Sequence, residues 1–311
     1  MTPNPTFLVV GAARSGTTAL VEDLRGHPRI FVTKPKEPHY FALHDQQPNF
    51  TGPGDATTIN RIATPSLATY RALYPSDHRD YDALGEGSVS TLYYYRDAIP
   101  EIKRVAPRAK LIVILREPVD RAKSAYDYLV SKGHETAPSF LDALAREPER
   151  IEHGYQHLWH YTSMSLYAES VAAFLDAFDQ DQVRVWFHDD LVRDYDRTMS
   201  SVRRFIGINE PREGTEPSAA PRVNVSGTPR SATLTRTLRV AAEHEASRRA
   251  IRAVTTFSFR ERVRRMMITS NALDPATREL LAPRFSEDLA SLRALLPNRR
   301  LPNWLAEPEA G

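Results

Sequence analysis

The stretch "FLVVGAARSGTTAL", residues 7–20, joins a run of apolar residues to a turn with two glycines and then to a helical pattern. This order predicts a buried parallel strand, a loop and the N-terminus of a helix. Gly11, Gly16 and Thr18 match the phosphate-binding pattern G-x-x-x-x-G-K-[ST], but Thr17 replaces the lysine. Backbone N–H groups and the positive end of a helix dipole converge at such a turn. The stretch therefore predicts an anion site without a lysine at that position.

The rest of the chain alternates apolar runs with helical patterns. Further strands are predicted at 29–33, 110–116 and 183–187, and 85–95 is predicted as a strand or an extended turn. Helices are predicted at 98–107, from Pro118 onward, along 164–178 and around 199–206. Strands and helices that alternate in this way predict an α/β fold with a doubly wound, mostly parallel sheet flanked by helices.

The chain is predicted to form a single domain over residues 1–311, with a core at about 6–231 and a helical C-terminal extension at about 232–311. Residues 44–66 and 210–230 lack periodicity and are rich in proline, glycine and polar residues, so both are expected to be loops, the first a surface loop or lid. The extension ends in an apolar segment at 301–305. Before it lies an amphipathic helical pattern with apolar positions at Leu281, Phe285, Leu289, Leu292 and Leu296.

The composition is that of a soluble globular protein, with 41% hydrophobic and 26% charged residues. The formal net charge of +2 gives no overall attraction to nucleic acid or to an anionic membrane. The absence of cysteine excludes disulfides, thiolate catalysis and cysteine zinc sites. No signal-peptide pattern or apolar stretch of membrane-spanning length is present, so we expect a cytoplasmic protein without stable membrane insertion. Abundant alanine and a preference for arginine over lysine favour a GC-rich, bacterial genome.

A second motif, "VILREPVDRAKSAY" at 113–126, places Arg116 at the end of an apolar strand. Ser124 follows about two turns into the helix that Pro118 begins. Parallel strands of one sheet bring their carboxyl ends to the same edge, so Arg116 and Arg14 are expected to face one crevice. Two cationic sites on one edge predict a ligand with two separated phosphate groups.

Simpler structural interpretations exist for both motifs. The first could be an ordinary strand-to-helix turn, although Arg14 supplies the charge that is missing at Thr17 and the neighbouring hydroxyl groups add hydrogen-bond donors. In the second, Arg116 could pair with Glu117 or Asp120 on the surface. The position of Arg116 after a wholly apolar strand favours a functional role.

In this order the two motifs resemble the sulfotransferases that use 3′-phosphoadenosine 5′-phosphosulfate, especially the branch with heparan sulfate sulfotransferases and bacterial relatives. The resemblance spans about residues 6–231 and implies a P-loop NTPase-like sulfotransferase fold. It implies that the 5′-phosphosulfate is bound by Arg14, Ser15, Gly16, Thr17 and Thr18. It also implies that Arg116 and Ser124 hold the 3′-phosphate. A later basic loop of the family is similar to "NVSGTPRS" at 224–231, where Arg230 is the expected nucleotide contact.

A candidate general base follows the second predicted strand. The segment "TKPKEPHYF", residues 33–41, offers Glu37 and His39 at the same edge of the sheet. A carboxylate or imidazole there could take the proton of an acceptor hydroxyl. The family resemblance implies that Glu37 is the catalytic base, that His39 supports it, and that Arg14 contributes to catalysis as well as to donor binding.

The chain departs from the family pattern after the third predicted strand. In the related branch a glutamate at this place is followed by a catalytic lysine, whereas here Glu86 is followed by Gly87. Lys34, Lys36 or Arg14 could supply the missing cation. Glu86 remains an alternative base.

Sulfuryl transfer needs cations around the bridging phosphate and a base on the acceptor, without an obligatory metal ion, so no metal site is expected. The implied reaction is in-line transfer from 3′-phosphoadenosine 5′-phosphosulfate to a hydroxyl group, leaving adenosine 3′,5′-bisphosphate. The acceptor is expected to be a sugar, a lipid or a natural product. The aromatic run Tyr93–Tyr95 either lines an acceptor pocket or packs as a strand edge.

Two other functions remain open. A P-loop kinase or NTPase could use Asp189 or Asp190 as its acid, although capping of the next helix is the simpler role for these residues. A non-catalytic module that binds nucleotide or nucleic acid could use the basic segment 236–265, although interspersed glutamates favour a solvated helix there and no nucleic acid partner is expected. The sulfotransferase interpretation explains both motifs together.

Overall fold

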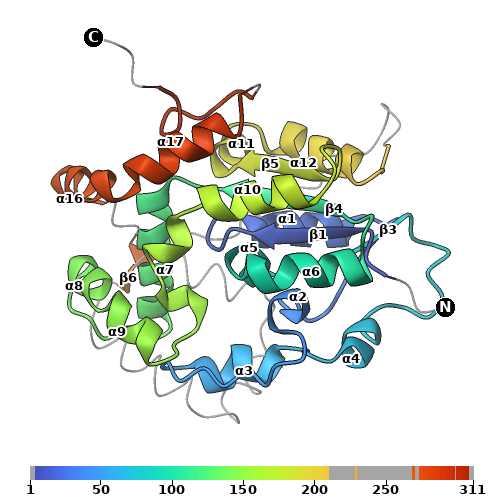
Figure 1. Ribbon diagram of the computed structural model, residues 1–311, viewed down its shortest axis with the longest axis horizontal. Coiled ribbons are helices and arrows are strands. Elements are labelled where there is room, and N and C mark those ends of the chain that lie inside the picture. Colours follow the sequence, from blue (N-terminus) through green and yellow to red (C-terminus); the bar gives the residue numbers. More distant parts are fainter. Residues whose placement is uncertain (1–3, 210–227, 230–267, 270–272, 298, 308–311) are drawn as a thin grey trace.

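The computed structural model describes residues 4–209, 228–229, 268–269, 273–297 and 299–307. Its centre is a sheet in the order β2-β3-β1-β4-β5 (Figure 1). All neighbouring strands in this sheet are parallel. The strands are β1 (Phe7–Gly11), β2 (Ile30–Val32), β3 (Ala83–Gly87), β4 (Lys110–Leu115) and β5 (Val183–Phe187). This confirms the predicted α/β fold with a doubly wound, mostly parallel sheet.

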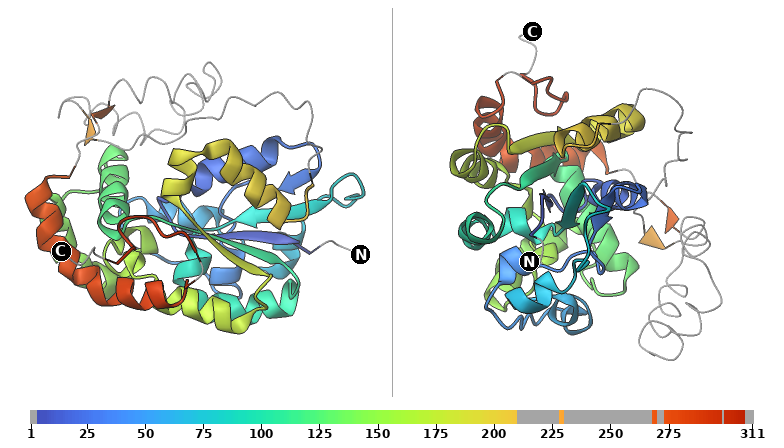
Figure 2. Two further views of the ribbon diagram at one scale, coloured as in Figure 1. Left: turned by 90° about the horizontal axis from the view of Figure 1, so that it is seen from above. Right: turned by 90° about the vertical axis from the view of Figure 1, so that its right-hand side faces the viewer.

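Helices cover both faces of the sheet (Figure 2). One face packs on α1 (Thr17–Gly26) and α12 (Tyr195–Phe205), and the other on α6 (Tyr95–Val105) and α10 (Ala168–Ala177). The α7 helix (Pro118–Ser131) follows β4. Further helices are α2 (Tyr40–Leu43), α3 (Ile59–Ile62), α4 (Leu67–Arg71), α5 (Ser90–Tyr93), α8 (Phe140–Ala145), α9 (Glu147–Glu152), α11 (His188–Arg193), α16 (Pro275–Leu281) and α17 (Ser286–Ala294).

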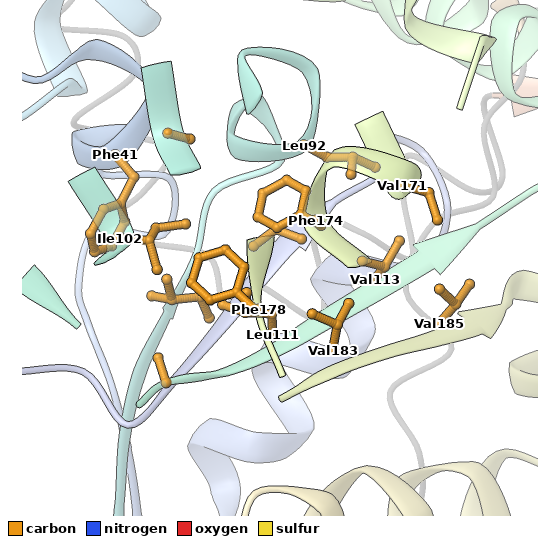
Figure 3. Close-up of a cluster of buried hydrophobic side chains, with 14 of the residues drawn as sticks. Phe41, Leu92, Ile102, Leu111, Val113, Val171, Phe174, Phe178, Val183 and Val185 are labelled. Carbon is orange, nitrogen blue, oxygen red and sulfur yellow. The ribbon is translucent and has the colours of Figure 1, made fainter. Parts of the chain in front are cut away.

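The apolar runs of the strands are continuous because both faces of the sheet are buried. In β4, Leu111 and Val113 belong to the cluster that includes Phe174 and Phe178 of α10 (Figure 3). The alternate residues of the same strand, among them Ile112, belong to the cluster on the α1 and α12 side. Alternation of side chains along each strand thus divides the core into two layers.

Of the described C-terminal helices, α17 packs against α10, whereas Leu281 of α16 is buried in the cluster of α7 residues (Figure 2). Asp288 of α17 accepts hydrogen bonds from the N–H groups of Tyr167 and Ala168, both at 2.9 Å, at the start of α10. Leu292 and Leu305 are buried in the same cluster. The predicted amphipathic helix is therefore present, as α16 and α17 joined by a 3₁₀ turn.

Two segments differ from expectation. The 85–95 segment is extended only as far as Gly87 and then forms α5. Residues 44–66, expected to be a loop or lid, contain α3 and are fixed by Asp55, whose carboxylate accepts hydrogen bonds from the backbone N–H and side-chain amide of Gln156 at 3.0 and 2.7 Å. This buried anchor excludes a lid that moves freely at that point.

Three predictions lie wholly or almost wholly outside the described residues: the loop at 210–230, the contact Arg230 and the basic segment 236–265. Of the loop, only Thr228–Pro229 (β6) is described, and it forms an antiparallel ladder with Ile268–Thr269 (β7). In the part of the chain that the structure describes, no helix has the length and apolar character needed to cross a membrane.

Candidate active site

The carboxyl ends of the five strands bring the predicted site residues to one edge of the sheet. The loop after β1 carries Arg14 and Ser15, β2 leads into 33–39, and β4 leads into Arg116. His188 follows β5 at the same edge. This is the position at which open parallel sheets bind ligands.

The loop between β1 and α1 has the geometry of an anion site. Gly16, the N-cap of α1, has φ 96°, a conformation that favours glycine, and a Cβ there would lie 2.9 Å from Leu191 Cδ1, so that side chain would have to shift. Arg14 is also left-handed, with φ 67°. The Ser15 hydroxyl is fully buried and has no hydrogen-bond partner among the described residues. A buried donor without a partner at a helix N-terminus fits a bound phosphate or sulfate oxygen.

The two predicted phosphate-binding motifs are in direct contact. Arg14 Nε donates a hydrogen bond to Ser124 Oγ at 3.3 Å. Arg116 Nη1 donates to the carbonyl oxygen of Arg14 at 3.1 Å, and the Tyr167 hydroxyl donates to the carbonyl of Arg116 at 2.9 Å. The structure therefore brings Arg14, Arg116 and Ser124 together, as the shared sheet edge predicts.

Arg116 does not form the predicted alternative surface pair within the described residues. Glu117 and Asp120 both pair with Arg278 of α16. Glu117 also caps α7, because its carboxylate accepts hydrogen bonds from the first free N–H groups of that helix. The acidic residues after the strand are thus occupied, and Arg116 is directed to the first loop instead.

The backbone around Glu37 and His39 is held in an uncommon conformation. Both residues are left-handed, with φ 65° and 55°. The N–H of Glu37 donates to the Gly87 carbonyl at 3.1 Å, and the N–H of His39 donates to Ser88 Oγ at 3.0 Å. Such conformations cost about 1–3 kcal/mol each and persist where the surroundings fix them. The loop after β2 is therefore fixed by residues that follow β3.

The Glu37 carboxylate is held at both oxygens and stays partly exposed. Its Oε2 accepts a hydrogen bond from the N–H of Val89 at 2.8 Å, and its Oε1 forms an ion pair with Lys36 Nζ. The side chain of Glu37 is 19% exposed. Three residues were proposed to replace the missing family cation: Lys34, Lys36 and Arg14. Of these three, Lys36 forms the ion pair with the Glu37 carboxylate.

His39 is buried and neutral at physiological pH. Burial, and secondly the charge of Lys36, lower the pKa of its imidazole to about 3. Its Nδ1 lies 2.7 Å from Ser90 Oγ, and its ring meets that of His157 at 5.8 Å between centroids. These contacts fix the ring and make His39 a less accessible base than Glu37.

Glu86 is 1% exposed, and burial raises the pKa of its carboxyl from 4.5 to about 8. The hydrogen bond from Ser88 Oγ, at 2.7 Å, opposes this rise, and the Glu37 charge adds to it. At neutral pH the carboxyl carries a proton, so it cannot accept another from an acceptor.

Glu86 makes folding stability depend on pH. Its pKa is higher in the folded than in the unfolded chain, so its contribution to stability decreases as pH rises from about 4.5 to 8. Relative to Glu86→Gln, the wild-type free energy of unfolding is expected to fall by about 1 kcal/mol per pH unit on average between pH 6.5 and 8, less steeply as the pH approaches 8. Urea denaturation at a series of pH values measures this difference. Equal slopes for the two proteins would show that Glu86 is already ionised at pH 6.5.

Gly87 leaves no room for a side chain. A Cβ at this position would lie 2.6 Å from Cγ2 of Val21, a fully buried residue of α1. A lysine at this position therefore requires a shift of the Val21 side chain or of α1. The close approach of helix and strand explains the glycine.

The aspartates of the rival NTPase hypothesis have structural roles. Asp190 accepts a hydrogen bond from the N–H of Phe187 at 3.1 Å, which caps α11, as the sequence indicates. Asp189 accepts one from Trp304 Nε1, also at 3.1 Å. These contacts leave both carboxylates engaged in the fold.

Sequence reasoning missed Tyr128 and His188. The guanidinium of Arg14 lies 4.6 Å from the centroid of the Tyr128 ring, one helical turn after Ser124 on α7. A Cβ at Gly16 would lie 3.4 Å from His188 Cδ2, and the pKa of His188 is lowered to about 4 by burial and by Arg116. The i, i+4 relation to Ser124 is a sequence signal for Tyr128.

The predicted aromatic run lines a cavity. Tyr93, Tyr94 and Tyr95 border a space of about 490 Å³ together with Ala12 and Tyr167. The cavity lies beside α5. Ser88 and Val89, which precede this helix, and Ser90, its first residue, bind Glu37 and His39. Tyr93 ends α5, Tyr95 begins α6 and Tyr94 lies between the two helices, so the alternative of a packed strand edge is wrong.

Comparison with known proteins identifies relatives of this chain. A family model described as "Sulfotransferase family" matches residues 5–212. Human heparan sulfate glucosamine 3-O-sulfotransferase 6 is 31% identical over 208 residues, which cover 66% of this chain and 52% of that protein. The mouse 3-O-sulfotransferase 3B1 is 28% identical over 204 residues, or 66% of this chain and 46% of that protein. The chain thus spans about half the length of the curated relatives that it matches.

A solved structure resembles nearly the whole chain. The crystal structure of a sulfotransferase from Alicyclobacillus acidocaldarius is similar with a TM-score of 0.73 and 30% sequence identity. The match covers 97% of this chain and 99% of the other.

Proposed function

The chain belongs to the sulfotransferase family, and from this premise we propose that it transfers a sulfuryl group from 3′-phosphoadenosine 5′-phosphosulfate to an acceptor hydroxyl. The observation that carries the proposal is the contact of Arg14 with both Arg116 and Ser124 at the sheet edge. It supports one anionic ligand held by two motifs that are about 100 residues apart in the sequence. The kinase alternative is not favoured, because the lysine is absent and Asp189 and Asp190 are engaged.

The donor would be held through its two phosphate-bearing ends. The N-terminus of α1 and the loop residues Arg14, Ser15, Gly16, Thr17 and Thr18 would take the 5′-phosphosulfate. Arg116 and Ser124 would take the 3′-phosphate, and Arg230 remains a predicted further contact. The orphaned Ser15 hydroxyl supports this assignment.

Glu37 would remove the proton of the acceptor hydroxyl. Its carboxylate is partly exposed and held by Val89 and Lys36, whereas Glu86 is already protonated at neutral pH and His39 is buried. As Glu37 takes up the proton, its attraction for Lys36 weakens. The ammonium group would then be available to the charge that develops on the transferred group.

A carbohydrate hydroxyl is the acceptor to test first. The names of both mammalian relatives specify a glucosamine of heparan sulfate. Lipid and natural-product hydroxyls remain alternatives, and the cytoplasmic location and bacterial source stay predictions.

The proposal is tested by two measurements on the purified chain. Calorimetric titration with adenosine 3′,5′-bisphosphate in the presence of EDTA is expected to show binding without a metal ion. Incubation with the ³⁵S-labelled donor and a heparan sulfate oligosaccharide, or a host-cell extract, is expected to give a labelled product. Absence of bisphosphate binding together with Mg²⁺-dependent ATP hydrolysis would favour the kinase alternative.

Arg14→Ala is expected to weaken bisphosphate binding and to lower the transfer rate, each by about 10-fold or more, since charge-assisted hydrogen bonds contribute about 1.5–3 kcal/mol. Calorimetry and initial rates measure the two effects. Arg14→Lys keeps the charge but loses the Nε donor to Ser124, so we expect an intermediate loss. Wild-type affinity in Arg14→Ala would exclude the loop as the donor site.

A further inference from the structure

A chain of three hydrogen-bonded groups links β3 to the loop that carries the candidate base. The N–H of His39 donates to Ser88 Oγ at 3.0 Å, and Ser88 Oγ donates to Glu86 Oε2 at 2.7 Å. The side chains of Glu86 and Ser88 are both buried. Neither side chain belongs to the residues proposed above to bind the donor, so we consider another role for these hydrogen bonds.

This chain of hydrogen bonds ends at the N–H of His39, two positions after Glu37 in the sequence. Glu37 and His39 are both left-handed, and their N–H groups are held by Gly87 and Ser88, adjacent residues at the end of β3. Val89, the next residue, donates its N–H to Glu37 Oε2. Residues 86–89 therefore fix the orientation of the Glu37 carboxylate.

We propose that Glu86 is a positioning residue for sulfuryl transfer, which acts through Ser88 to hold the backbone of His39 and the carboxylate of Glu37 in the reactive arrangement. The inference rests on the proposed function, because Glu37 is the base only if the chain transfers a sulfuryl group to a hydroxyl. It assigns to Glu86 no contact with either substrate.

The charges around Glu86 make this positioning depend on its protonation state. Lys36 and Glu37 face it from the loop after β2, Tyr70 from α4, Tyr74 from the turn that follows α4, and Ser88 from its own segment. While Glu86 is neutral, Lys36 forms an ion pair with the carboxylate of Glu37 and has no second carboxylate at Glu86 to attract it. Ionised Glu86 repels Glu37 and competes with it for Lys36, so the arrangement is lost at alkaline pH.

The catalytic test compares pH profiles. Wild-type kcat, measured with a heparan sulfate oligosaccharide that the wild type sulfates, is expected to fall above pH 8. In Glu86→Gln, whose amide oxygen still accepts from Ser88, this alkaline fall is expected to disappear. Asp55→Asn is the matched control, because Asp55 is also a carboxyl whose pKa is raised by burial, but it anchors the 44–66 segment to Gln156 and is not among the residues that line the cavity beside α5. We expect it to keep the wild-type profile.

A second variant tests the mechanical link. Ser88→Ala removes the bridge between Glu86 and His39, and its kcat is expected to fall about 10-fold or more while the Kd for adenosine 3′,5′-bisphosphate stays within about threefold of wild type. A role limited to general stability would lower the melting temperature without changing kcat in the folded protein. The proposal would be overturned if kcat of Glu86→Gln still fell above pH 8 as in the wild type. It would also be overturned if Ser88→Ala lost donor affinity and kcat to the same extent.

An acceptor-independent measurement separates this inference from the proposed function. In protein labelled with ¹³C at the glutamate carboxyl, NMR titration is expected to show Glu86 titrating near pH 8 and a linked shift of the His39 amide. In Ser88→Ala the His39 amide should no longer respond. If no acceptor is ever sulfated but this response is present, the proposed function fails and the link stands. If transfer occurs and the amide does not respond, the inference alone fails.

Discussion

Arg116→Ala is expected to weaken the binding of adenosine 3′,5′-bisphosphate by at least about 100-fold, equivalent to about 2.8 kcal/mol. Arg116 ends the apolar strand β4 and is only partly exposed, so its charge meets a ligand in a site with little competing water. It also holds the first loop through the carbonyl oxygen of Arg14. Loss of the Arg116 side chain therefore has two effects. It removes a partner of the 3′-phosphate, and it removes the hydrogen bond that holds the loop after β1. Calorimetric titration measures the change.

Two further variants separate the causes. Arg116→Lys keeps the positive charge but not the paired N–H donors of guanidinium, so we expect an intermediate affinity. Arg96→Ala removes one guanidinium from an exposed pair with Glu169 and should leave affinity unchanged, which controls for net charge. The circular dichroism spectrum of Arg116→Ala should match the wild type. Wild-type affinity in that variant would refute the 3′-phosphate site.

Glu37→Gln is expected to lower kcat by about 10²–10⁴ while bisphosphate affinity is preserved. The amide has the shape of the carboxylate and can still accept from the N–H of Val89, but it cannot take a proton from the acceptor. Initial rates at saturating donor and calorimetry of the bisphosphate measure the two quantities. The contrast between a lost rate and a retained affinity distinguishes a base from a donor-binding residue.

Glu22→Gln provides the matched control for Glu37→Gln. Glu22 is also paired with a nearby cation, Arg25, but it lies on α1, is 38% exposed, and takes no part in the hydrogen bonds described for Glu37. Its replacement should leave kcat unchanged. Near wild-type turnover in Glu37→Gln would transfer the base role to His39.

The sheet, and the meeting of Arg14 with Arg116, could be predicted because each depends on local rules. The buried strands were visible as apolar runs, and Pro118 marked the first turn of α7. The common edge then followed from the direction of parallel strands. The binding and catalytic roles of these residues remain predictions that the variants above test.

The segment after β3 could not be predicted in the same way. Its tyrosines favour a strand by propensity, yet α5 forms there because distant residues decide the local conformation. Ser88 and Ser90 bind His39, which is 49 and 51 residues away in the sequence. Likewise, Asp55 is fixed by Gln156, 101 residues away, and no local pattern in 44–66 signals that contact.

The tight contact between Gly87 and Val21 also constrains how this protein could change. Placing the related branch's lysine at position 87 would force its Cβ into Val21, so the single substitution would destabilise the chain before any catalytic benefit appeared. A smaller residue at position 21 would have to come first, at the expense of some core packing. The two positions are thus epistatic. A lysine at position 87 is therefore expected to be tolerated better in a variant that already carries a smaller residue at position 21.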